Sequence, residues 1–249
     1  MNDNSPSRTE RDRLLRKLES IASLTQEEKQ ALLSLPMTVK DIPEDRDIVS
    51  LGERPNACCL ILDGWACRYK MLPEGGRQIM SFHVPGDLPD LQSLHLKTMD
   101  HSLATLVPTK VALIQHRVMH DVIRRFEGIS TALWRESLID AAIFREWMVG
   151  IGRRSSHQRI AHQLCEMATK LRAVGLNDGH TYPWPVTQQE VADSLGLTGV
   201  HVNRVLRDLR KTGLIATARG VFTATDWDGL KRLGQFDEGY LHMDSGIAA

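Results

Sequence analysis

The sequence predicts an α+β protein with a β-rich N-terminal half, one long helix and a smaller helical domain that carries a two-stranded wing. Three observations lead to this prediction. Residues 38–116 consist of short apolar runs separated by turn residues, residues 117–152 have a helical period, and residues 186–215 contain two helical patterns separated by Gly196. Many short strands are typical of a sandwich or jelly roll, and two short helices around a glycine are typical of a helix–turn–helix.

Residues 9–35 are predicted to form two helices. The pattern TQEE at Thr25–Glu28 is a capping box that places the start of the second helix there, and Pro36 ends that helix. The first helix is indicated by apolar residues at helical spacing, namely Leu14, Leu15, Leu18 and Ile21.

Apolar runs of strand length follow between residues 38 and 116: DIVSLGERP, ACCLIL, WACRYKML, RQIMSFHV, SLATLV and KVALIQH. The dipeptide Asp63-Gly64 and the PEGG sequence at residues 73–76 lie between runs, and both have the residue types of hairpin turns. A jelly roll is therefore the predicted architecture of this part.

The cysteines are expected to be buried, reduced thiols. They are Cys58, Cys59, Cys67 and Cys165, and no two have C-x-x-C spacing, which argues against a zinc ribbon. Cys58 and Cys59 are neighbours in an expected strand, so they point to opposite faces of the sheet. Ligation of haem or of an iron–sulfur cluster is the alternative that this pattern leaves open.

Residues 129–151 predict a helix of about six turns. Its apolar residues cover more than one stripe, which favours packing on its own domain along one side and on a second copy of the chain along the other. A helix buried within its own domain is the alternative. The residues expected near a seam between two copies are Leu133, Ile139, Ile143 and Trp147.

The stretch from Gly152 to Ser156 breaks this helix, another helix follows, and residues 175–185 are predicted to be a loop. Thr187 and Glu190 then form a capping box, Gly196 allows the left-handed backbone that ends the first short helix, and Thr198 is the expected N-cap of the second. One face of the second helix carries an apolar stripe of Val202, Val205, Leu206 and Leu209.

The opposite face of that helix is polar and basic. It carries Val200, Asn203, Arg204, Arg207 and Lys211, and two short strands around Arg219-Gly220 follow as a wing. A helix that is docked on one side and basic on the other suits the major groove of DNA. The expected DNA-contacting residues are Thr187, Gln188, Thr198, Gly199, Val200, His201, Asn203, Arg204, Arg207, Lys211 and Arg219.

The distribution of charge agrees with an anionic partner for this part of the chain. The 249 residues have a formal net charge of zero, but residues 153–225 carry 10 Lys and Arg against 5 Asp and Glu. A local basic excess favours an anionic partner, although a solvated helix face shows the same excess. No apolar run approaches the roughly 20 residues of a membrane span, and the N-terminus lacks a signal-peptide core, so we expect a cytoplasmic protein without a membrane partner.

Over residues 20–230 the chain resembles the Crp/Fnr family of bacterial transcription regulators, with LILDGWACRY and FHVPGDL as the matching β-roll segments. The resemblance implies a β-roll of the cyclic-nucleotide-binding type (1–127), a dimerisation helix (128–152) and a winged helix–turn–helix (153–232), followed by an acidic tail (233–249) that we expect to be flexible. It also implies a homodimer that binds an inverted repeat in double-stranded DNA, with RNA polymerase as a further partner.

Two segments depart from the family pattern. Arg204 matches the family's arginine late in the recognition helix, but Gly199-Val200 replaces the earlier Arg-Glu pair, so a different DNA sequence is expected. Nucleotide-responsive members hold the cyclic phosphate with a Gly-Glu and an arginine some ten residues later. Here the pair is Gly86-Asp87, Pro89 removes a backbone donor, and no arginine occurs between residues 77 and 117.

We therefore expect no response to cyclic AMP or cyclic GMP. Lys97 or His101 would be the substitutes for the missing arginine, whereas Asp90 and Asp100 add negative charge that disfavours an anion. The β-roll would sense another signal or serve as a scaffold. The residues of a ligand pocket would be Gly86, Asp87, Leu88, Lys97 and His101.

Three alternatives exist for the β-roll: a cyclic-nucleotide-responsive regulator, a metal or redox sensor that uses its Cys and His residues, and an enzyme. The sequence contains no nucleophile elbow and no phosphate loop, and no His-x-His pair has a matching downstream carboxylate. We expect no catalytic residue, no metal site and no cofactor. The identity of any effector, and activation as opposed to repression, do not follow from the sequence.

Overall fold

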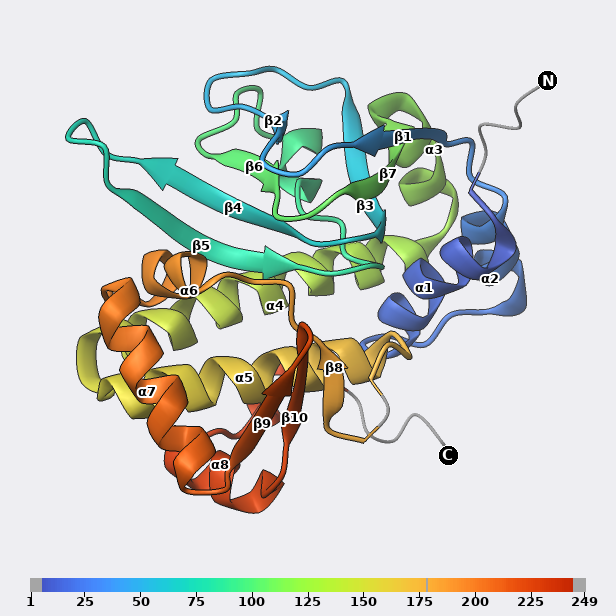
Figure 1. The fold of residues 1–249 in the computed structure, drawn as a ribbon. Helices are drawn as coiled ribbons and strands as arrows, with labels where there is room; N and C mark the ends of the chain where they lie inside the picture. Colours follow the sequence, from blue (N-terminus) through green and yellow to red (C-terminus); the bar gives the residue numbers. More distant parts are fainter. Residues whose placement is uncertain (1–5, 178, 244–249) are drawn as a thin grey trace. The chain divides into compact units, whose positions relative to one another are not determined.

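The structure is a computed structural model that describes residues 6–177 and 179–243 (Figure 1). The chain divides into two units, one built mainly from residues up to Lys70 with Phe82–Asp140, the other from Met71–Ser81 with Ala141–His242. We call them the N-terminal and C-terminal units. Among the described residues, no helix has the length and apolar character needed to cross a membrane.

Two capped helices open the N-terminal unit, α1 (Arg8–Glu19) and α2 (Gln26–Leu33). The predicted capping box at Thr25 and Glu28 is confirmed, and a second one, at Ser7 and Glu10, starts α1. The Glu28 carboxylate also accepts a hydrogen bond from the backbone N–H of Gly128 at 2.7 Å, which fixes the start of the long helix against α2.

Seven antiparallel strands form the two sheets that the sequence predicted as a jelly roll. The sheet orders are β1-β7-β3 and β2-β6-β4-β5, and the core between them includes the fully buried Cys59, Ile61 and Val111. The strands are β1 (Thr38–Ile42), β2 (Asp47–Val49), β3 (Ala57–Asp63), β4 (Ala66–Met71), β5 (Arg77–His83), β6 (Ser102–Thr105) and β7 (Thr109–Gln115).

The prediction of a hairpin at Asp63-Gly64 is wrong, because β3 pairs with β7 whereas β4 pairs with β6. The dipeptide forms a corner at which the chain passes from one sheet to the other. Gly64 has φ +84°, and a Cβ at this position would lie 2.5 Å from Thr109 Oγ1. The turn at PEGG is confirmed, with Leu72 N donating to Gly76 O at 2.7 Å.

The predicted long helix is α4 (Glu127–Arg153), which follows α3 (His116–Arg125) after a break at Phe126. The helix has two apolar stripes, one buried and one exposed, and the seam between two copies stays a prediction. The four residues named for it are all buried against their own chain: Leu133, Ile139, Ile143 and Trp147. Because α4 is apolar on most of its circumference, the sequence could not tell which stripe the protein core covers.

The exposed stripe of α4 carries Trp134, Leu138 and Met148, whose side chains are 67%, 52% and 72% exposed. The half-buried Ala141 lies between them on the same face. The spacing from 134 to 138, 141 and 148 follows steps of four, three and seven, which is the heptad spacing of a helix that packs on another helix.

The C-terminal unit packs its remaining helices and a three-stranded sheet around α5 (Ser156–Ala173) (Figure 1). Residues predicted as a loop contain a strand, β8, because Thr181–Pro183 pair with β10 and the buried Tyr182 hydroxyl donates to Leu164 O at 2.7 Å. The other elements are α6 (Gln188–Leu195), α7 (Gly199–Lys211), β9 (Ile215–Ala218), β10 (Val221–Ala224), α8 (Trp227–Gly234) and η2 (Glu238–Leu241).

The acidic tail expected to be flexible is packed as far as Leu241, so that expectation is wrong for this part; residues 244–249 lie outside the described residues. The Tyr240 hydroxyl donates to Glu166 Oε2 at 2.6 Å, and Trp147 Nε1 donates to both carboxylate oxygens of Glu166 at 3.1 Å. Burial raises the pKa of Glu166, and this effect is larger than the lowering by Lys170 and by the two hydrogen-bond donors. The tail therefore completes the surroundings of a buried carboxyl group.

Candidate nucleic-acid interface

The turn between α6 and α7 follows the sequence prediction. Thr187 Oγ1 accepts from Glu190 N at 3.2 Å, and the Glu190 carboxylate accepts from Thr187 N at 2.6 Å, so the capping box is confirmed. Gly196 ends α6 with φ +63° and ψ +42°, the left-handed conformation. Thr198 caps α7 by accepting from His201 N at 3.3 Å.

The two faces of α7 differ as the sequence predicted. Val202, Val205 and Leu209 are buried against the unit, and Leu206 is half-buried beside them. On the open face Val200 is 84% exposed, and four polar side chains stand exposed with it: Asn203, Arg204, Arg207 and Lys211. The helix therefore has a docked apolar side and a free basic side.

The first turn of α6 borders the same face. Asn203 Nδ2 donates to Gln188 Oε1 at 3.0 Å, which places the exposed Gln188 beside the open face of α7. Gly199 packs closely on α6, since a Cβ there would lie 3.3 Å from Gln189 Oε1. Thr187, Thr198 and His201 are committed to capping hydrogen bonds through a hydroxyl or a backbone N–H.

The wing is present next to this helix. Strands β9 and β10 pair antiparallel with Ala218 opposite Val221. The turn between them consists of Arg219 with φ +50° and Gly220 with φ +74°, both left-handed, as a tight two-residue hairpin requires. Arg219 is exposed at the tip of the wing.

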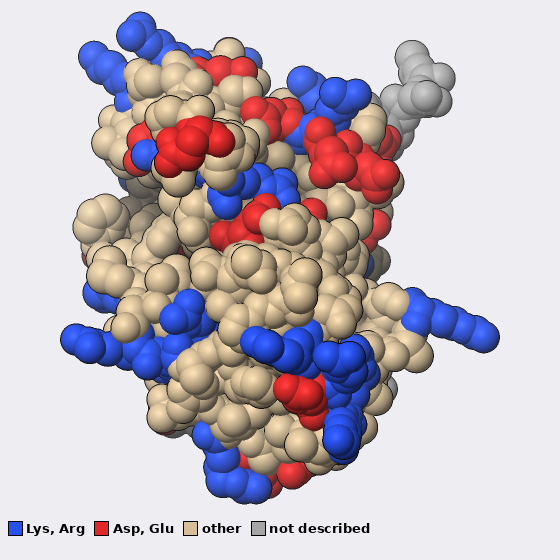
Figure 2. Space-filling model, turned by 60° about the vertical axis from the view of Figure 1, so that its left-hand side comes forward, with Lys and Arg blue, Asp and Glu red and all other residues tan. Residues whose placement is uncertain are grey.

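The open face is electropositive. Figure 2 shows Lys and Arg side chains close together over the lower part of the view, with few acidic side chains among them. On α7 the acidic residue is Asp208, whose carboxylate lies 3.2 Å from His157 Nε2. A basic helix face of this kind attracts the phosphate backbone of a nucleic acid.

A docked helix with an exposed basic face, crossed by a capped helix and flanked by a two-stranded wing, defines a winged helix–turn–helix DNA-binding protein. Residues 158–233 match the family model of the Crp-like helix-turn-helix domain, and residues 39–126 match that of the cyclic nucleotide-binding domain. The chain belongs to the Crp/Fnr family of transcription regulators.

Relatives and solved structures support this membership. The chain is 33% identical over 169 residues to the nitrogen fixation regulation protein FixK of Bradyrhizobium diazoefficiens, which covers 67% of this chain and 69% of that protein. It is 27% identical to FixK of Rhizobium meliloti over 75% of this chain and 82% of that one. The structure of FixK2 from Bradyrhizobium japonicum has the same fold, with a TM-score of 0.73 at 23% identity over 80% of this chain and 98% of that chain.

In the β-roll, the loop that matches the nucleotide-binding segment of the family is closed on the protein core. Gly86, with φ +99°, donates from its N–H to Ile61 O at 2.8 Å. Asp87 and Leu88 are buried, and Asp87 Oδ2 accepts from Val84 N at 3.1 Å. The Asp87 side chain is therefore directed into the protein.

Lys97 and His101, the other two residues predicted for a ligand pocket, have different surroundings. Lys97 is exposed and lines a pocket of about 330 Å³ together with Arg54, His95 and His116. His101 Nδ1 lies 2.7 Å from Asp100 Oδ1, and burial, helped by the charge of Arg68, lowers the pKa of His101. The assignment of these five residues to one ligand pocket stays a prediction.

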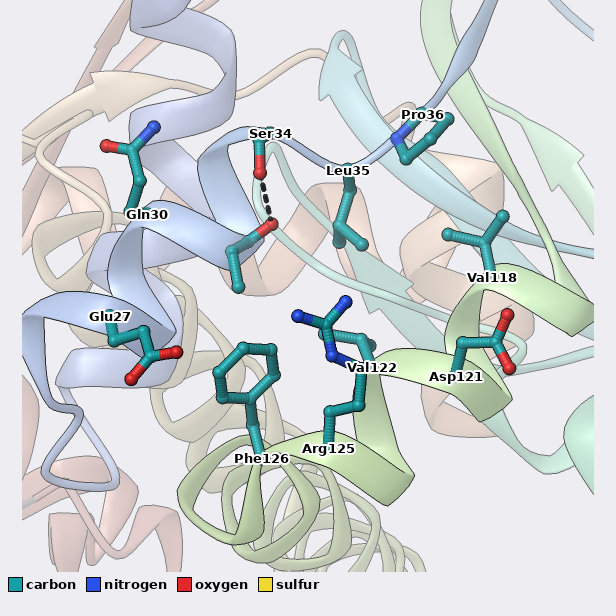
Figure 3. Close-up of a pocket in the computed structure, with 11 residues that line it drawn as sticks. Glu27, Gln30, Ser34, Leu35, Pro36, Val118, Asp121, Val122, Arg125 and Phe126 are labelled. Carbon is teal, nitrogen blue, oxygen red and sulfur yellow. Dashed lines mark hydrogen bonds between the residues drawn. The ribbon is translucent and has the colours of Figure 1, made fainter.

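A second pocket in this unit, of about 500 Å³, lies between α2 and α3. Figure 3 shows the Arg125 guanidinium group and the Phe126 ring on one side of it, with Ser34 and Leu35 across from them. Neither this pocket nor the one at Lys97 is lined by Gly86, Asp87 or Leu88.

Sequence reasoning missed the two cations that do reach the loop. Lys17 of α1 is buried with its Nζ 3.4 Å from Asp87 Oδ1. Arg68 of β4 is also buried, and its Nε donates to Pro89 O at 2.8 Å. A signal for Lys17 was available, because it occupies a position of the apolar stripe of α1 between Leu14 and Leu18.

Asp90 carries less negative charge than the sequence suggested. Its side chain is fully buried, Oδ1 accepts from Cys59 N at 2.8 Å, and Oδ2 has no hydrogen-bond partner among the described residues. Burial raises the pKa of Asp90 to about 7, against the lowering effects of the Cys59 N–H and of Arg68. The carboxyl group is therefore protonated in a large fraction of molecules at neutral pH.

Replacing Asp90 by asparagine is expected to stabilise the β-roll more at pH 8 than at pH 5. Since the folded-state pKa lies above the ordinary value of 3.8, the stabilising contribution is complete below that value and is lost as the pH rises through about 7. The loss has an upper bound of about 4 kcal/mol, from a shift of the pKa from 3.8 to about 7 at about 1.4 kcal/mol per pKa unit. Urea unfolding of the wild type and of Asp90→Asn at both pH values, followed by amide exchange of β3, measures it. An equal difference at both pH values would contradict a protonated Asp90.

All four cysteines are buried, as expected. Burial raises the pKa of Cys58 and of Cys165 to about 12, and that of Cys59 well above its ordinary value, which suppresses the reactive thiolate. Within residues 6–177 and 179–243, no three His, Cys, Asp or Glu side chains are grouped in a way that could hold a metal ion.

Proposed function

We propose that this regulator acts as a homodimer that joins along the exposed stripe of α4 and binds an inverted repeat of double-stranded DNA, with one α7 in each half-site. The observation that carries the DNA contact is the free basic face of α7, which ends beside the wing and the first turn of α6. The DNA-contacting residues are those predicted from the sequence, with Arg204 as the central one.

The dimer is supported by the apolar character of the α4 surface. Trp134, Leu138 and Met148 form an exposed stripe at heptad spacing, and a patch of this kind on a helix marks an interaction surface. Half-sites about one helical turn of DNA apart follow from a two-fold dimer. We also propose RNA polymerase as a further partner, because the chain belongs to a family of transcription regulators. We propose the cytoplasm as the compartment, because the DNA that the protein would bind lies there.

The signal that we propose for the β-roll is not a cyclic nucleotide. The Asp87 carboxylate is turned inward and lies next to Lys17, and the exposed Lys97 lines a pocket to which Gly86, Asp87 and Leu88 do not contribute. A buried phosphate needs cations and backbone donors around it, and both Lys17 and Arg68 at this loop already have carboxylate or carbonyl partners. The β-roll either senses a different ligand or acts as a scaffold.

Replacing Arg204 by alanine is expected to weaken binding to the preferred site by about 1–3 kcal/mol per half-site, because a bidentate contact to a guanine is lost. The site is first selected from a random DNA pool, and affinity is then measured by fluorescence anisotropy. The side chain is exposed, so the melting temperature should not change.

Arg232→Ala is the matched control, since Arg232 is also an exposed arginine of the same unit but lies on α8. It should bind the selected DNA as the wild type does. Unchanged affinity for Arg204→Ala would show that α7 does not enter the groove with this face.

A further inference from the structure

A buried lysine links three elements of the N-terminal unit. Lys17 projects from α1, and its Nζ lies 3.4 Å from Asp87 Oδ1 in the nucleotide-type loop and 3.4 Å from Glu136 Oε1 on α4. All three side chains are largely withdrawn from solvent. One ammonium group therefore bridges a loop carboxylate and a carboxylate of the helix that we propose as the dimer seam.

A second bridge runs parallel to the first. Arg68 of β4 donates from Nε to Pro89 O and forms an ion pair with Asp140 on α4. Glu136 and Asp140 are four residues apart, so they lie on the same face of α4, one turn from each other. Two cations thus connect the segment from Asp87 to Pro89 with one face of α4.

The buried charges in these two bridges depend on each other as partners. A buried charge is stable only when it is paired, and removal of one partner of a buried pair is strongly destabilising. Burial opposes the charged form of Lys17, but the carboxylates of Glu136 and Asp87 outweigh it and raise its pKa, so the ammonium stays charged at every physiological pH. The Asp87 carboxylate is therefore already occupied by a cation of the same chain.

We propose that Lys17 is a built-in substitute for an effector: its ammonium group couples the nucleotide-type loop to the dimerisation helix α4 without any bound ligand. Helix α1 thereby supplies, through Lys17, the contact with the loop that a small-molecule effector supplies in ligand-dependent regulators. DNA binding by the chain is accordingly ligand-independent and requires Lys17. This inference rests on the proposed function, in which α4 positions two copies of α7.

The test compares full-length variants for binding to the selected DNA at a temperature at which circular dichroism shows each to be folded. Lys17→Met should lower the affinity at least tenfold. Lys29→Met is the matched control, because Lys29 forms an ion pair with Glu19 at the surface, and it should leave the affinity unchanged. Cyclic AMP and cyclic GMP at millimolar concentration should change neither the wild-type affinity nor the wild-type melting temperature.

The triple variant Lys17→Met, Asp87→Asn and Glu136→Gln separates coupling from simple stability, because it removes the cation and the two carboxylates together. It should regain most of the melting temperature that Lys17→Met loses, while its DNA affinity stays low. Wild-type affinity in a folded Lys17→Met or in the triple variant would overturn the proposal, as would a rise in wild-type affinity with either nucleotide. Failure of the proposed function would appear separately, as absence of a selected DNA site for the wild type.

Discussion

Leu138→Glu is expected to convert the dimer into a monomer and to lower its affinity for the inverted repeat roughly hundredfold or more. Leu138 lies in the exposed stripe of α4, 52% exposed and flanked by Trp134. A glutamate there would place two like charges at a two-fold seam and bury them without partners. Since the second half-site is bound as an intramolecular event, loss of the dimer removes the avidity, which amounts to about two or more orders of magnitude.

Leu51→Glu is the matched control. Leu51 is a leucine of the β-roll that is 58% exposed, so the same substitution changes charge and surface polarity equally without touching α4. Sedimentation at micromolar concentration should give a monomer for Leu138→Glu and a dimer for Leu51→Glu. A dimeric Leu138→Glu would place the seam elsewhere.

Gly64→Ala is expected to destabilise the β-roll strongly. Gly64 has φ +84°, which costs a residue with a side chain about 1–3 kcal/mol. In addition, the new Cβ would lie 2.5 Å from Thr109 Oγ1 and 2.7 Å from Pro108 O, and the backbone of β7 cannot move away without opening the sheet. The two effects together reach roughly 3 kcal/mol or more, a large share of the stability of a domain.

Gly52→Ala separates the two effects, because Gly52 has φ +85° but has no atom within 4 Å of an added Cβ. Urea unfolding should show a moderate loss for Gly52→Ala and a much larger one for Gly64→Ala. Equal losses would mean that β7 yields to the methyl group and that only the backbone conformation matters.

Features set by residues close together in the sequence could be predicted. The capping boxes at Thr25 and Thr187, the left-handed Gly196 and the two faces of α7 each depend on residues within one or two helical turns. The interaction that decides these features lies inside the segment itself, so one sequence suffices. The basic face of the candidate DNA interface belongs to this group.

Features decided by distant segments could not be predicted in the same way. β8 exists because β10 pairs with it, and the covered side of α4 depends on which elements pack there. The search for a phosphate-binding cation considered only the residues that follow Gly86, whereas the cations at the loop come from α1 and β4. Lys17 reaches Asp87 across 70 residues of sequence, and no periodicity encodes that contact.

The Tyr240–Glu166 hydrogen bond has a consequence for folding during translation. The two residues are 74 positions apart, with the whole helix–turn–helix and wing between them. During synthesis, domains fold from the N-terminal end first, so the β-roll can assemble while the C-terminal unit is still being translated. A nascent chain that pauses anywhere between α5 and Tyr240 holds Glu166 without its phenolic donor. The C-terminal DNA-binding unit therefore finishes folding after the β-roll.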